Sequence, residues 1–291
     1  MAIQRYLSVA SNSTDANFRS WGKSLSDALE ALGVTKTADT GQIDWSTVLK
    51  PSGSPMVMGY EIRQFTDDLQ AANPVIIKFE YGASTSGSGG PCPGIKITVG
   101  SASDGAGALT GSTSSVFSLF STASDAVVFY PSYVSSDGGR VNLALWISET
   151  ATLPLAFWIE RLKDTNGTPI ADGINICYMG SATYSKQQFL PAGGGSAFPP
   201  APLNSFCCCF PPSTPTTYNE NIGIFPVYPH LGYSGNPDLG GLVYLPAELD
   251  CGGAVMTINL YGTNHSYILM GAMGQVYVNG RGYASVMVRC E

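Results

Sequence analysis

Residues 74–81 read PVIIKFEY, and together with YEIRQF at 60–65 and GIKITV at 94–99 they decide the fold class. The three runs are short, rich in β-branched or aromatic residues and separated by turn-forming residues, as is typical of β-strands. Similar runs bounded by glycine, proline, asparagine or aspartate occupy 126–130, 141–147, 156–162 and 174–178. No βαβ spacing separates these runs. The pattern therefore predicts a mainly β protein, with one or more antiparallel β-sandwich or barrel-like domains.

One segment has the period of an amphipathic helix instead. Its apolar residues recur at steps of three and four positions, at Phe18, Trp21, Leu25, Leu29 and Leu32. Capping candidates at 13–15 precede this run and a glycine at 33 follows it, so we expect a helix over about residues 15–33. The apolar stripe has to be covered, either by the chain's own β domain or by a neighbouring subunit.

Segment 191–217 fits neither pattern. It holds seven of the 19 prolines and almost no charge, so it predicts no regular element. Its aromatic residues Phe198, Phe206 and Phe210 favour an extended arm packed on a surface over a solvated linker. We expect residues 1–190 to form the helix and a β domain. Residues 218–291 should form a β-meander that either completes this domain or stands alone, with strands at 254–261, 266–270, 275–278 and 283–289.

The composition excludes several classes of partner. Charged residues make up 12% of the chain, against about 25% in an ordinary soluble domain, and the net charge is −7 without any basic run. Nucleic acid is therefore not expected as a partner. A membrane is not expected either, because no stretch approaches the roughly 20 apolar residues of a spanning helix. A surface this poor in charge favours a subunit of an assembly, and the first residues show no secretory signal, so we expect a protein made and kept in the cytoplasm.

The sequence shows no catalytic constellation. The chain has two histidines: His230 lies in a string without the spacing of a nucleophile elbow, and His265 lies in a predicted hairpin turn. The nearest group of carboxylates is Glu61, Asp67 and Asp68, where we expect Thr66 and Asp67 to cap a short helical turn. We expect neither an enzyme nor a cofactor.

Metal sites are not expected either. Asp104-Gly105 offers oxygen ligands for calcium, but Asp-Gly is more often a turn, and no closing glutamate follows at the required spacing. The seven cysteines are an odd number with one triplet, Cys207–Cys209, which does not suggest a disulfide scaffold. Neighbouring thiols in extended chain point apart, so we interpret the triplet as small apolar groups and not as metal ligands.

Several strings resemble those of a poorly characterised family of tailed-bacteriophage virion proteins, which are associated with the tail or other parts of the particle. They are SLSDALEALG and DTGQIDW within 24–45, GYEIRQF and PVIIKFEYG within 59–82, TVG, DGAG and LTG within 98–111, and IER, KDTNG and ADGI within 159–174. The C-terminal third carries none of them. Such a resemblance implies a component of the particle, and it brings no catalytic or binding residues with it.

These observations together lead to the expectation of a non-enzymatic structural subunit of a virion, assembled in the host cytoplasm and associated with the tail or baseplate. Its partners would be copies of itself and other virion proteins. The candidate interface residues are Phe18, Trp21, Leu25, Phe198, Phe206 and Phe210. The alternatives are a tail appendage that binds a host surface glycan or receptor, and a head decoration protein.

Overall fold

The computed structural model describes residues 2–9, 14–87, 90–114, 116–120, 129–136, 140–145, 155–163, 169–181, 184–190, 225–226, 242–245, 255–260, 263–269 and 285–289. These residues are mostly β, with antiparallel strands and one N-terminal helix, α1 (Asp15–Ala31). The predicted fold class is confirmed to that extent. The predicted arm at 191–217 and the predicted strand at 275–278 lie outside the described residues.

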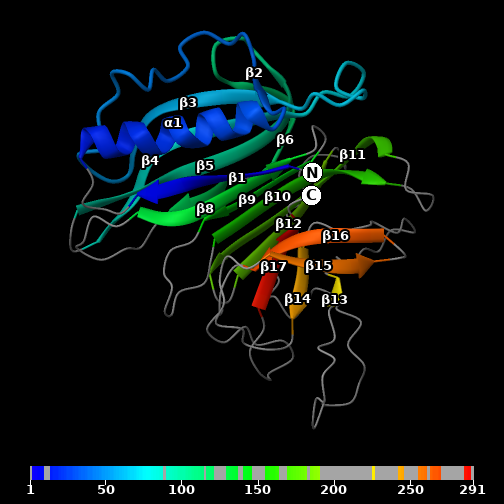
Figure 1. Cartoon of the computed structure of the whole chain (residues 1–291). Coiled ribbons are helices and arrows are strands. Elements are labelled where there is room, and N and C mark those ends of the chain that lie inside the picture. The colour runs from blue at the N-terminus through cyan, green and yellow to red at the C-terminus, as the bar shows by residue number, and fades with distance from the viewer. Residues whose placement is uncertain are drawn as a thin grey trace.

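The described strands form three antiparallel sheets (Figure 1). The β4 sheet has the order β2-β3-β4-β5-β6, with β7 also paired to β5. Its strands are β2 (Thr35–Lys36), β3 (Met56–Gln64), β4 (Ile76–Gly87), β5 (Gly90–Ser103), β6 (Leu109–Thr113) and β7 (Phe117–Phe120).

The β10 sheet has the order β1-β8-β9-β10-β11-β12. Its strands are β1 (Ala2–Val9), β8 (Phe129–Ser136), β9 (Arg140–Leu145), β10 (Leu155–Lys163), β11 (Pro169–Ser181) and β12 (Tyr184–Leu190). The chain thus starts in this sheet, passes through α1 into the β4 sheet, and returns at β8, which pairs with β1.

The C-terminal sheet has the order β13-β14-β17-β16-β15. Its strands are β13 (Phe225–Pro226), β14 (Leu242–Leu245), β15 (Val255–Leu260), β16 (Thr263–Leu269) and β17 (Ser285–Arg289). The predicted turn at His265 is wrong. This residue lies inside β16 and pairs with Ile258, because the connection between β15 and β16 is shorter than we expected.

Helix α1 begins and ends where its capping chemistry allows. The hydroxyl of Thr14 accepts a hydrogen bond from the backbone N–H of Asn17 (3.2 Å), which satisfies one of the open donors of the first turn. Gly33 follows the helix with a φ of 78°, a conformation that glycine adopts without steric cost. The predicted helix is therefore confirmed, and its apolar stripe is buried.

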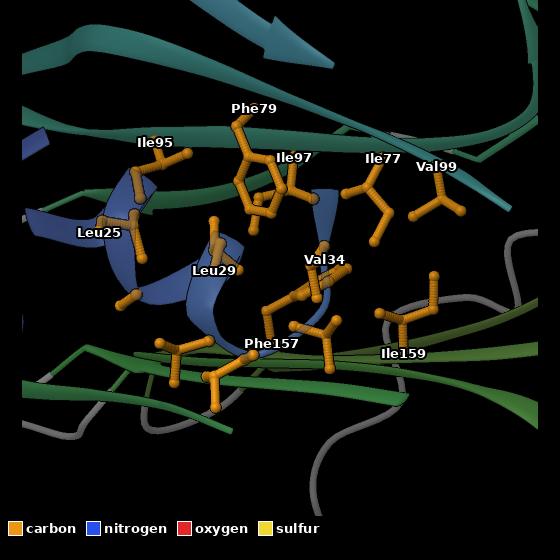
Figure 2. Close-up of a cluster of buried hydrophobic side chains, with 14 of the residues drawn as sticks. Leu25, Leu29, Val34, Ile77, Phe79, Ile95, Ile97, Val99, Phe157 and Ile159 are labelled. Carbon is orange, nitrogen blue, oxygen red and sulfur yellow. The ribbon is translucent and has the colours of Figure 1, made fainter. Parts of the chain in front are cut away.

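One apolar core joins α1 to the two larger sheets. In the β4 sheet, Phe79 pairs with Ile97 and Ile77 with Val99, and all four side chains are fully buried. Figure 2 shows these side chains on one side of the cluster, Phe157 and Ile159 of β10 on the other, and Leu25 and Leu29 of α1 between the two sheets. Because strand residues alternate between faces, residues 77, 79 and 81 of β4, residues 95, 97 and 99 of β5, and residues 157 and 159 of β10 contribute to this core.

Candidate functional site

The carboxylate of Glu61 in β3 is fully buried and lies at the centre of a polar cluster. Its Oε1 accepts hydrogen bonds from the hydroxyl of Ser26 in α1 (2.7 Å) and from Nε1 of Trp45 (2.9 Å). Lys36 of β2 forms an ion pair with the same oxygen, with Nζ at 2.7 Å. The hydroxyl of Tyr81 in β4 donates to Oε2 (3.2 Å). One carboxylate thus joins the helix, the loop after β2 and three strands of the β4 sheet.

Arg63 completes this cluster, two residues along the same strand. Its side chain is fully buried, and it forms an ion pair with Glu61 (Nη2 to Oε2, 3.0 Å). The remaining contacts are hydrogen bonds to the carboxylate of Glu30, the carbonyl oxygens of Val34 and Ser26, and the Ser26 hydroxyl. With the bond from Nε to Glu61, these contacts use all five N–H groups of the guanidinium. We call Ser26, Lys36, Trp45, Glu61, Arg63 and Tyr81 the Glu61 cluster.

The environment of Glu61 does not suit acid–base catalysis. Burial alone would raise the pKa of this carboxyl, but the charge of Arg63 and the hydrogen bond from Lys36 outweigh burial and lower the pKa below its ordinary value. The carboxylate therefore stays ionised, and its oxygens are occupied by donors from the chain itself. A general acid or a nucleophile needs an accessible oxygen, so the cluster is built to hold the fold together.

We expect the Glu61 cluster to make the protein sensitive to acid. A carboxyl whose pKa is lower in the folded state contributes stability above its unfolded pKa, near 4.5, and loses that contribution as pH falls through the folded pKa. Urea unfolding measured from neutral pH into acid should therefore show the free energy of unfolding falling. In Glu61→Gln, which cannot titrate at this site, the fall should be shallower. Equal pH dependence of the two proteins would contradict this assignment.

Arg161 of β10 connects the β10 sheet to the turn after β3. The side chain is 4% exposed, and both Nε and Nη2 donate to the carboxylate of Asp67. Its Nη1 donates to the carbonyl oxygen of Asn73 (2.9 Å), and the guanidinium lies 5.8 Å from the centre of the Phe65 ring. The turn that we predicted after β3 is present, but Asp67 does not cap it: the carboxylate instead compensates the buried arginine.

The two partners of this ion pair should respond differently to replacement. Asp67→Ala leaves a buried guanidinium without its carboxylate, and we expect a loss of about 3 kcal/mol in the free energy of unfolding. Arg161→Met leaves the carboxylate of Asp67, which is 21% exposed and can be hydrated, so the loss should be about 1–2 kcal/mol smaller. Chemical denaturation of both variants measures the two losses in the free energy of unfolding and shows which is larger. A larger loss in Arg161→Met than in Asp67→Ala would contradict it.

An open hollow of about 730 Å³ lies beside this turn. Its lining is mostly apolar and comes from residues 64–68, 70, 71, 74, 76, 101 and 102. Of the polar side chains around it, Asp67 is bound to Arg161, and Gln70 donates to and accepts from the backbone of Val75. Glu61 is not part of the lining. Of the three carboxylates that the sequence suggested as a group, Glu61 and Asp67 therefore serve separate structural contacts, and Asp68 lines the hollow.

Asp104 forms a turn, as the simpler interpretation of Asp104-Gly105 suggested. Its Oδ1 accepts from the backbone N–H groups of Ala106 (2.8 Å) and Ala108 (3.0 Å), which lowers the pKa of the carboxyl. Gly105 has a φ of 81°, which suits glycine at this point of the turn. Among the described residues, no three or more histidine, cysteine, aspartate or glutamate side chains lie close enough to share a metal ion.

The predicted interface residues divide into two groups. Phe18, Trp21 and Leu25 are at most 1% exposed and belong to the chain's own core. They are therefore not accessible to a neighbouring subunit in this structure. The physical reason is that α1 lays its apolar stripe on the chain's own sheets. Phe198, Phe206 and Phe210 lie outside the described residues, as do Cys207–Cys209 and His230.

Sequence reasoning did not single out the exposed apolar residues. Leu49, Met56 and Val57 are 58%, 38% and 50% exposed and lie within one short stretch of chain around the start of β3. Val116 and Val255 are also exposed, at separate places in the chain. Exposure of a hydrophobic residue depends on tertiary structure, and no signal in the sequence distinguishes these residues from core residues.

Comparison with protein-family models, with curated proteins and with solved structures found no match. Within the part of the chain that the structure describes, no helix has the length and apolar character needed to cross a membrane.

Proposed function

We propose that this chain is a non-enzymatic structural subunit of a tailed-bacteriophage virion, associated with the tail or baseplate. The assignment to a phage particle is supported by the sequence strings between residues 24 and 174, which resemble those of the virion protein family. The low content of charged residues supports a subunit of an assembly. The main support for a structural role is that the buried charged side chains are paired with other residues of this chain. Glu61 and Arg63 join α1 to the β4 sheet, and Arg161 is paired with Asp67 across the two larger sheets.

We further propose that the β4 and β10 sheets form a β-sandwich that includes α1. Support comes from the single apolar cluster to which both sheets and the helix contribute. Two sheets that share one core behave as one mechanical body, which is what a subunit under load in a particle requires.

The test is quantitative mass spectrometry of purified phage particles. We expect peptides of this chain in the particle at the low copy number of a tail or baseplate component. A high copy number, typical of a shell, would instead support the head decoration alternative. Absence from particles that contain the known tail and head proteins would contradict the virion role altogether.

One observation favours the alternative of a tail appendage that binds a host glycan or receptor. The hollow beside the turn after β3 is open, and the turn is held firmly by Arg161 and by Gln70. Binding of the purified protein to a glycan array, lost in Ala102→Trp, would support this alternative. Absence of binding to glycans and to host cells would remove it.

A further inference from the structure

We draw no further inference here: the strongest candidate, the open and mostly apolar hollow beside the turn between β3 and β4, belongs to the glycan-binding alternative already described, and nothing in the structure shows what covers it.

Discussion

Replacing Gly22 with alanine should destabilise the protein by about 3 kcal/mol, even though alanine is the better helix former by about 1 kcal/mol. Gly22 lies in the middle of α1, and a β-carbon there would overlap the six-membered ring of Trp45. The ring cannot move aside at low cost, because it packs edge-on against Tyr81 at 4.7 Å and its Nε1 donates to Glu61. A shift of the indole would therefore also weaken a hydrogen bond to a buried charge.

Urea unfolding of Gly22→Ala measures this effect, and Gly53→Ala is the matched control. A β-carbon on Gly53 would meet no atom within 4 Å, so its replacement should change the free energy of unfolding by less than about 1 kcal/mol. A stabilised Gly22→Ala protein would show that helix propensity outweighs the contact with Trp45. It would also show that the indole does not lie against the backbone of α1.

Replacing Glu61 with alanine should cost about 3–5 kcal/mol of the free energy of unfolding. The replacement leaves Arg63 fully buried without its closest carboxylate. It also removes the acceptor that Ser26, Trp45 and Tyr81 share. Buried charges and polar groups without partners are among the costliest defects in a folded protein. The variant should unfold at a much lower urea concentration.

Glu30→Gln provides the control for this variant, because Glu30 also contacts Arg63. The carboxylate of Glu30 is 53% exposed, so the loss of its charge should cost no more than about 1 kcal/mol. If both replacements cost the same, the interaction with Arg63 would not depend on burial, and the central role of Glu61 would be wrong.

The elements of the fold were predictable where one period dominated the sequence. The steps of three and four between Phe18 and Leu29 predicted α1, and runs such as that at 74–81 predicted β4 and its neighbours. The strand β1 was not predicted, because its pairing partner β8 lies far along the chain and its own residues alternate only weakly. Strands of this kind are defined by tertiary pairing more than by local preference.

The Glu61 cluster had a signal that sequence reasoning did not use. Glu61 and Arg63 are two residues apart in a predicted strand, so they lie on the same face, and opposite charges side by side on one face of a strand suggest an ion pair. The remaining members come from α1, β2, the loop after β2 and β4, and only the folded chain brings them together. For the same reason, the stripe of α1 could not be assigned to the chain's own core from its pattern alone.

The path of the chain between the two larger sheets also sets an order of events during synthesis. The first strand leaves the ribosome long before its partner exists, because Ala2 pairs with Ser136. Helix α1 and strands β2 to β5 can meanwhile collapse around their own aromatic residues, since their contacts are closer in sequence. We therefore expect the N-terminal strand to be recruited late, because its backbone groups lack their partner strand until β8 emerges.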